Sequence, residues 1–222
     1  MSEYKFKNIK VGIINLNINN IFSIYSCFKS LGFNTKIISK NDKTKYNLII
    51  LPGVGSFKYA MKKIKENGYD EKIFRHIENK QNFLYGVCLG MQLLLDESQE
   101  FGNSKGLSLI KGNVKKLKGN KTYNVPNIGW HKIYPTNDNF IKNNQFKKYF
   151  YFVHSFYCDV GNYKYQNTHF KFNNQNICAS IRKDNIIGTQ FHPEKSGKEG
   201  NKLVYNLKRF FEWGYYMAYQ KK

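Results

Sequence analysis

Short, mostly apolar runs alternate with helically spaced apolar residues through the first hundred positions of the chain. The runs lie at 9–14, 33–38, 46–51 and 83–87, and each is typical of a strand in a buried sheet. Between the first two runs, Ile21, Ile24 and Phe28 recur at helical spacing, with Asn19 or Asn20 placed to cap the helix. This succession predicts an α/β fold with a mostly parallel, open sheet flanked by helices.

Two more helices are expected between the third and fourth runs. Ser56 is placed to cap the first, which carries Ala60, Met61 and Ile64, and a shorter helix follows over 73–77. Beyond residue 102 the pattern weakens. We expect a strand at 149–153, a hairpin of 177–181 and 186–191 around 183–185, and an amphipathic, aromatic segment at 203–217. No repeat, linker or boundary interrupts the chain, so residues 1–222 are expected to form a single domain.

The fourth run leads directly into a cysteine between two glycines. Cys88 lies between Gly86 and Gly90, and an apolar helical pattern begins after Gly90. A nucleophile between small residues at a strand-to-helix turn has the form of a nucleophile elbow, and the helix N-terminus favours a thiolate. A buried, inert cysteine in an apolar strand fits this stretch equally well on its own.

A second candidate group ends the last apolar run of the chain. His192 follows that run, and Glu194 comes two residues later. A nucleophilic cysteine needs a base within hydrogen-bond reach, and the base needs a third group to fix its tautomer. His192 and Glu194 suit these two roles. A lone histidine is more often structural, so it is the combination with Cys88 that carries the interpretation.

These candidates share a position relative to the expected strands. Pro52–Gly55, Cys88 and His192 each follow a strand. In parallel α/β sheets, ligands bind at the carboxyl ends of the strands. We therefore expect all three segments to meet at one edge of the sheet.

Composition narrows the function classes. The chain has 222 residues, which is enough for one domain with a substantial core. No apolar run approaches the length of a membrane span, and the first residues lack a secretory core, so a cytoplasmic protein without membrane contact is expected. The four cysteines show no C-x-x-C pairing, so neither a disulfide framework nor a metal site is expected, and no cofactor either.

The formal net charge of +21 invites a nucleic-acid interpretation. Lysines are scattered through every segment, however, with only short doublets such as 62–63 and 115–116. Such uniform enrichment is typical of compositional bias, so nucleic-acid binding is not expected. The charge is suited to steering association with an acidic partner.

Three segments together carry a family resemblance. Leu51-Pro-Gly53-Val-Gly55, Gly-Val-Cys88-Leu-Gly-Met-Gln and Phe-His192-Pro-Glu194-Lys-Ser resemble the signatures of class I glutamine amidotransferases. With the segments 127–130 and 151–157, the chain resembles more narrowly the glutaminase subunits of imidazole glycerol phosphate synthases. The matching segments extend from residue 51 to residue 196.

The resemblance implies hydrolysis of L-glutamine to glutamate and ammonia by Cys88, His192 and Glu194. It assigns the oxyanion donors to the N–H of Leu89 and to one N–H of the turn Gly53-Val54-Gly55. It places the substrate against four residues, namely Gln92, His154, Ser155 and Phe156. It also implies a heterodimer with a synthase (cyclase) subunit, to which ammonia passes near Trp130 and Lys195.

Two segments depart from the family pattern. Residues 15–20 replace an Asp-Tyr-Gly-x-Gly-Asn turn, and Asn127-Ile-Gly-Trp130-His131 replaces His-x-Gly-Trp-Asn. Both lie outside the triad. They leave open a paralogous subunit that supplies ammonia for an amidino sugar of a surface polysaccharide. A Cys-His hydrolase of similar fold and a non-catalytic binding module are the alternatives from other classes.

Overall fold

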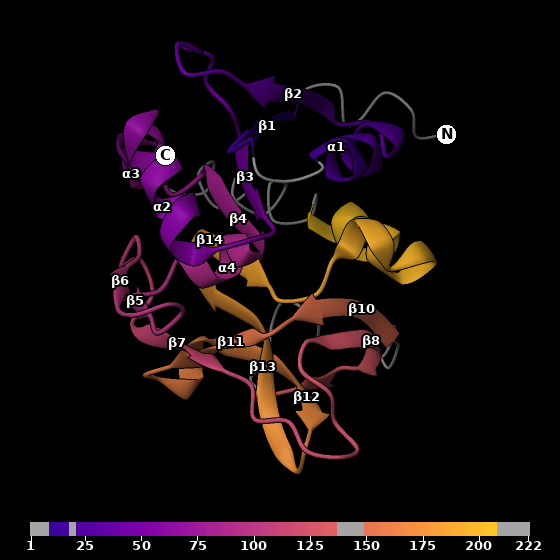
Figure 1. Cartoon of the computed structure of the whole chain (residues 1–222). Coiled ribbons are helices and arrows are strands. Elements are labelled where there is room, and N and C mark those ends of the chain that lie inside the picture. The colour runs from indigo at the N-terminus through magenta and orange to yellow at the C-terminus, as the bar shows by residue number, and fades with distance from the viewer. Residues whose placement is uncertain (1–8, 18–20, 137–148, 208–222) are drawn as a thin grey trace.

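A central mixed sheet organises the chain (Figure 1). The computed structural model describes residues 9–17, 21–136 and 149–207. Among these residues the sheet has eight strands in the order β2-β1-β3-β4-β14-β13-β12-β9. The strands are β2 (Asn34–Ile38), β1 (Lys10–Ile14), β3 (Leu48–Gly53), β4 (Phe83–Cys88), β14 (Ile186–Thr189), β13 (Gln175–Lys183), β12 (Gln166–Phe172) and β9 (Tyr134–Pro135). The run from β2 to β14 is parallel, as expected, whereas β13, β12 and β9 extend it with antiparallel pairs.

Helices cover both faces of the parallel part. These elements are α1 (Ile21–Ser30), α2 (Phe57–Glu66), α3 (Tyr69–Glu78), α4 (Leu89–Leu93) and a helix over 197–207. Alternate residues of β3 point to opposite faces. Ile50 packs in one core with Phe28 of α1 and Leu203 of the helix over 197–207, whereas Leu51 packs in the other with Ile64 of α2. The α/β fold with a flanked, open sheet is confirmed.

The β-rich second half forms two smaller sheets beside the antiparallel strands. In the described residues, one has the order β11-β7-β5-β6, and the other pairs β10 with β8 as an antiparallel ribbon. The strands are β5 (Glu97–Ser98), β6 (Ser104–Lys105), β7 (Gly112–Lys116), β8 (Asn127–Lys132), β10 (Tyr149–His154) and β11 (Phe156–Val160), with short 3-10 turns η2 (Tyr163–Tyr165) and η3 (Pro193–Lys195). Only the strand at 149–153 and the hairpin of β13 and β14 were predicted here, and both are present.

The structure corrects one expected cap. Ser56 precedes α2, but its side chain makes no capping hydrogen bond. The Glu100 carboxylate takes that place, because its Oε2 accepts the Phe57 N–H at 2.6 Å. A carboxylate near a helix N-terminus also opposes the positive end of the helix dipole. The predicted caps Asn19 and Asn20, and most of the segment 203–217, lie outside the described residues.

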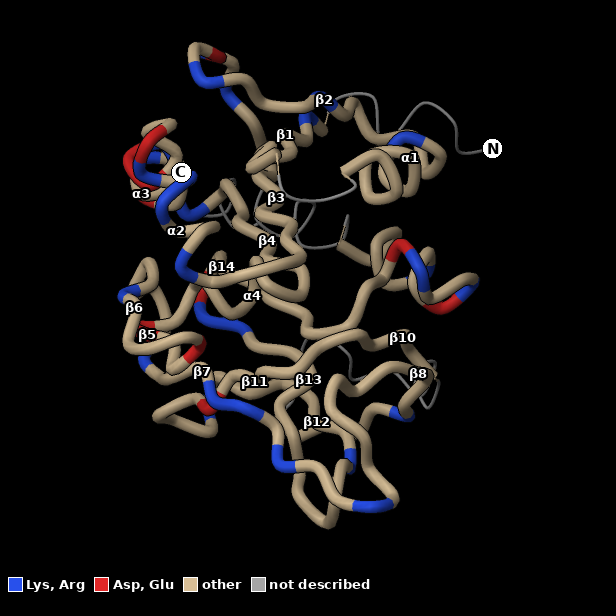
Figure 2. Tube along the Cα trace, in the orientation of Figure 1, with Lys and Arg blue, Asp and Glu red and all other residues tan. Residues whose placement is uncertain are grey.

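Basic residues are spread over the fold. Figure 2 shows Lys and Arg on the helical part around α2 and on the β-rich part around β7 and β13. This distribution agrees with compositional enrichment. Within the described ranges, no helix combines the length and apolar character that a membrane crossing needs.

Candidate active site

Cys88 stands at a strained turn between β4 and α4. It has φ 54° and ψ −110°, in the left-handed range that residues other than glycine rarely adopt. The flanking glycines are required by close packing: a Cβ on Gly90 would lie 1.6 Å from the Leu51 carbonyl oxygen, and one on Gly86 would lie 2.6 Å from the Gly90 oxygen. The geometry of a nucleophile elbow is therefore present.

The end of β3 lies directly beside Cys88. Gly53 is the register partner of Cys88 in the parallel pair of β3 and β4. A Cβ on Gly53 would meet Leu89 at 2.9 Å, so the two segments touch. Gly55 has φ 103°, which glycine adopts without strain. The turn and the first N–H of α4 thus border the same space, as an oxyanion site requires.

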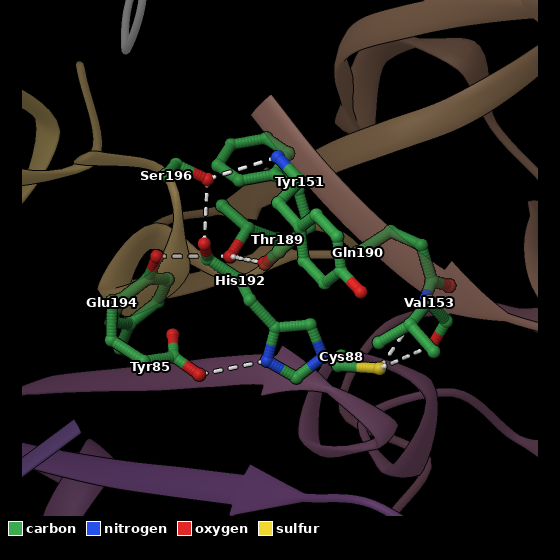
Figure 3. A network of polar contacts seen from close by, with 10 residues as sticks. Tyr85, Cys88, Tyr151, Val153, Thr189, Gln190, His192, Glu194 and Ser196 are labelled. Carbon is green, nitrogen blue, oxygen red and sulfur yellow. Dashed lines mark hydrogen bonds and ion pairs between the residues drawn. The ribbon is translucent and has the colours of Figure 1, made fainter. Parts of the chain in front are cut away.

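His192 and Glu194 form a buried pair behind the sulfur (Figure 3). The Nδ1 atom of His192 lies 2.8 Å from Oε1 of Glu194, and the two side chains are 4% and 7% exposed. The other ring nitrogen, Nε2, has no hydrogen-bond partner in the described part of the chain and faces Cys88. Glu194, His192 and Cys88 therefore stand in line.

The charges of this line reinforce one another. Burial by itself lowers the pKa of His192, but the Cys88 sulfur and the Glu194 carboxylate outweigh it and raise the pKa to about 10. A proton on His192 is thus favoured when Cys88 is a thiolate. This is the electrostatic state that a cysteine nucleophile with an acid behind it needs.

Backbone bonds from β10 hold the histidine in place. The His192 N–H donates to the Tyr151 carbonyl at 2.9 Å. The Ser196 hydroxyl donates to the His192 carbonyl at 2.6 Å and accepts the Tyr151 N–H at 3.0 Å. On the same strand, the Val153 carbonyl lies 3.8 Å from the Cys88 sulfur. The strand β10 therefore contacts both His192 and Cys88.

A cavity of about 260 Å³ opens in front of the sulfur. Its lining is Val54, Gly55, Cys88, Leu89, Gln92, Glu100, Pro126, Val153, His154, Ser155 and Phe156. The structure therefore brings the predicted substrate residues together with Cys88 and the predicted oxyanion turn. His192 and Glu194 lie behind Cys88, outside this lining.

Both ring nitrogens of His154 are held by neighbouring groups of the protein. Burial lowers its pKa to about 4, so the ring is neutral near neutral pH. Its Nδ1–H donates to the Phe156 carbonyl at 2.8 Å, and its Nε2 accepts from the Asn127 amide at 3.1 Å. With both nitrogens engaged, His154 is a wall of the cavity.

Two cavity-side residues were missed by the sequence analysis. Glu100 brings a carboxylate to the lining, and Gln190 donates from Nε2 to the Cys88 sulfur at 3.6 Å. The signal for Glu100 was the acidic stretch 96–100 in a strongly basic chain. Gln190 gave no signal of its own, since it lies at the end of the apolar run 186–191, two positions before His192.

The predicted partner residues meet at one aromatic side chain. Trp130 of β8 is 52% exposed, and its ring contacts Tyr151 edge-on at 5.9 Å between centroids. The Lys195 ammonium lies 5.9 Å from the same Tyr151 ring. Alternation along the ribbon puts Ile128 and Trp130 on its outer face, where both are exposed. We call this surface the outer face of the ribbon; it is formed by Ile128, Trp130 and Tyr151, with Lys195 beside it. It includes part of β10, the strand whose Tyr151 carbonyl accepts the His192 N–H.

No group of three His, Cys, Asp or Glu side chains suited to a metal occurs among the residues that the structure describes.

The model of the glutamine amidotransferase class-I family matches residues 13–211. The chain belongs to the class I glutamine amidotransferases. Its relatives include the imidazole glycerol phosphate synthase subunit HisH of Caldanaerobacter subterraneus, 41% identical over 89% of this chain and 96% of that protein. HisH of Chlorobium chlorochromatii is 38% identical over 89% and 98%, and HisH of Thermotoga maritima is 36% identical over 88% and 94%.

Solved structures agree on the fold of this amidotransferase. A crystal structure of a glutamine amidotransferase superimposes with a TM-score of 0.67 at 17% identity, covering 92% of this chain and 97% of that one. PurLQS from Thermotoga maritima gives a TM-score of 0.66 at 19% identity, covering 90% and 98%. The predicted class I amidotransferase architecture is thus confirmed.

Proposed function

We propose that this amidotransferase is the glutaminase subunit of an imidazole glycerol phosphate synthase in histidine biosynthesis. It hydrolyses L-glutamine to glutamate and ammonia and passes the ammonia to a separate cyclase subunit, as a heterodimer in the cytoplasm. The observation that carries the chemistry is the line of Glu194, His192 and Cys88 behind a cavity bordered by the end of β3. The similarity to HisH proteins over most of the chain supports the pathway.

Cys88 is the nucleophile in the proposed mechanism. Its thiolate attacks the side-chain amide carbon of glutamine, and the oxyanion forms beside the Leu89 N–H and the Gly53–Gly55 turn. His192 gives its proton to the leaving nitrogen, so ammonia departs and a thioester remains. His192 then takes a proton from water, the hydroxide attacks the thioester, and glutamate is released with the thiolate restored. Glu194 holds the His192 tautomer and its positive charge throughout.

Several groups of the cavity lining suit the amino-acid end of glutamine. Glu100 offers a carboxylate to the α-ammonium. Both N–H groups of Gln92 are used by the protein, at 2.9 Å to Phe156 O and 3.1 Å to Gln190 Oε1. Its amide oxygen is therefore the atom of Gln92 left for the substrate. Ser155 adds a hydroxyl to the same wall.

We assign ammonia delivery to the outer face of the ribbon. Free ammonia near neutral pH would be protonated and lost, so the exit must be covered by the cyclase. The exposed Trp130 and Ile128, with Lys195 beside them, offer an apolar contact edged by a cation. Basic charge elsewhere on the chain favours encounter with an acidic partner surface.

One observation favours the histidine pathway over a paralogous one. Asn127 and His131 exchange the residue types of the family pattern, yet His131 Nε2 donates to Asn127 Oδ1 at 2.7 Å. This chain therefore has a bonded histidine–asparagine pair at the two exchanged positions. An exchange of these two residue types by itself gives no reason to assign a new partner.

Cysteine labelling tests the nucleophile. Burial raises the pKa of Cys27 to about 11, with Glu194 adding to the effect, and burial also raises the pKa of Cys158 and Cys178. An electrophilic glutamine analogue should therefore label Cys88 alone, and Cys88→Ser should abolish turnover with the fold intact. Labelling at another cysteine, with Cys88→Ser still active, would reject the mechanism.

A further inference from the structure

Gln190 is a buried amide that the glutaminase mechanism above does not use. It follows β14 directly, has no exposed surface, and stands two residues before His192. Its Nε2 lies 3.6 Å from the Cys88 sulfur, and its Oε1 accepts from Gln92 Nε2 at 3.1 Å. A buried amide retained beside a nucleophile needs a reason, because burying polar groups is costly unless they are hydrogen-bonded.

Neighbouring hydrogen bonds fix which end of this amide faces the sulfur. Gln92 donates from Nε2 both to the Phe156 carbonyl and to Gln190 Oε1. Because a carbonyl oxygen only accepts, the Gln92 nitrogen must face Phe156, and it therefore presents a donor to Gln190. Turning the Gln190 amide over would set two N–H groups against each other. The N–H of Gln190 is thus directed at Cys88.

Two groups of opposite preference contact the sulfur. The Val153 carbonyl, 3.8 Å away, accepts a hydrogen bond from the neutral S–H. The Gln190 N–H, 3.6 Å away, donates to the sulfur, and its bond strengthens when the sulfur is an anion. The carbonyl dipole repels a thiolate, so the two contacts favour different protonation states of the same atom.

We propose that Gln190 is a positioning residue that holds the Cys88 thiolate by an N–H hydrogen bond, on a side of the sulfur not occupied by His192. The inference rests on the proposed role of Cys88 as the nucleophile. The bond sets the direction of the sulfur lone pairs toward the cavity and stabilises the anion before substrate binds. Gln92 links Gln190 to the substrate pocket. One of its N–H groups bonds Gln190 and orients that amide, and its own amide oxygen remains for glutamine.

Other titratable groups near the sulfur stay unchanged when Gln190 is replaced. They are His192 with Glu194 behind it, Glu100 and His154 at the cavity, and Cys158 in the neighbouring core. A change in Cys88 reactivity on replacing Gln190 therefore reports the lost contacts of its amide, of which the N–H is the one that touches Cys88.

The test is the pH dependence of Cys88 alkylation by iodoacetamide in the full chain, without glutamine. Gln190→Met keeps the length of the side chain and removes the donor, and Gln190→Asn keeps an amide but withdraws it by one methylene. A hydrogen bond to a charged group is worth about 10- to 100-fold in an equilibrium. Both variants should alkylate at least about 10-fold more slowly at pH 7, with the midpoint of the pH profile moved upward.

Ser180→Ala is the matched control. Ser180 is also fully buried in the sheet, and its hydroxyl bonds Thr168 at 2.6 Å without contacting the sulfur. It should lose stability yet keep the wild-type alkylation profile. Profiles of Gln190→Met and Gln190→Asn that coincide with wild type would overturn the role of Gln190. Failure of the wild-type protein to alkylate at Cys88 would instead reject the proposed nucleophile.

Discussion

The charge of Glu194 is the feature whose removal has the most predictable effect. Glu194→Gln keeps the size of the side chain and removes its charge. In the wild type, Oε1 bonds His192 at 2.8 Å, and Oε2 is buried without a hydrogen-bond partner in the described residues. The carboxylate therefore acts mainly on His192, and a neutral amide replaces it with little change in packing.

The magnitude follows from the bond that is lost. A buried hydrogen bond to a charged group contributes about 1.5–3 kcal/mol, or about 10- to 100-fold in rate if it acts fully in the transition state. Loss of the fixed tautomer adds to this effect. We expect kcat for glutamine hydrolysis to fall by about 10²–10⁴, the range of lost acid–base assistance, with a much smaller change in KM.

The same substitution changes the pH dependence of stability. Burial lowers the pKa of His192, but Cys88 and Glu194 outweigh it and raise the folded-state value to about 10, above the unfolded value of 6.5. A raised pKa stabilises the fold fully below pH 6.5, and this stabilisation is lost as the pH rises towards 10. The loss of unfolding free energy caused by Glu194→Gln should therefore be largest at or below pH 6.5 and should decrease as the pH rises towards 10.

Initial rates of glutamate formation, with the cyclase and its acceptor present, measure the first effect. Urea unfolding of the chain alone at several pH values measures the second. Glu71→Gln makes the same chemical change in an exposed ion pair with Arg75, which contributes little, and should leave both unchanged. A Glu194→Gln rate within threefold of wild type would refute the assignment of Glu194 as the orienting residue.

Three further changes test other parts of the account. Gly90→Ala places a Cβ against the Leu51 carbonyl and should cost at least about 1–3 kcal/mol in urea unfolding, whereas Gly161→Ala, with no atom closer than 3.6 Å, should cost far less. Asn127→His and His131→Asn should each lower the free energy of unfolding in urea by about 1–3 kcal/mol, and the double variant should lower it by clearly less than the sum of the two. Additive losses would show that the pair is not coupled. Trp130→Ala should reduce stimulation of glutaminase activity by the cyclase while the unfolding midpoint stays close to wild type; unchanged stimulation would remove Trp130 from the interface.

Most of the parallel half of the fold was predictable because β1, β3 and β4 are buried on both faces. Such strands appear as apolar runs, and β1, β3 and β4 lie where those runs predict them. The β-rich half carried a weaker signal. Strands such as β8 have one exposed face and little apolar contrast, so pairing with β10 decides their position. The position of such strands depends on tertiary contacts, and a local sequence pattern does not reveal these contacts.

The juxtaposition of Cys88, His192 and Glu194 was predictable from the sequence, whereas the residues around them were not. Cys88 and His192 each follow a strand, and parallel strands bring their carboxyl ends together, as observed. Glu100 and Gln190 act through contacts with residues 43 and 102 positions away. Spacing along the chain says nothing about such contacts. The same holds for Ser56, whose expected cap is replaced by the distant Glu100.

The most direct test of the central claim is glutaminase activity with and without the cyclase subunit of an imidazole glycerol phosphate synthase. The purified chain should hydrolyse glutamine very slowly, with the Gly53–Gly55 turn not yet donating to the oxyanion. Adding the cyclase with its acceptor should raise the rate by at least about 10²–10³, which is the value of one oxyanion donor. Full activity of the chain alone, unchanged by the cyclase, would contradict the account and make the protein a free-standing hydrolase.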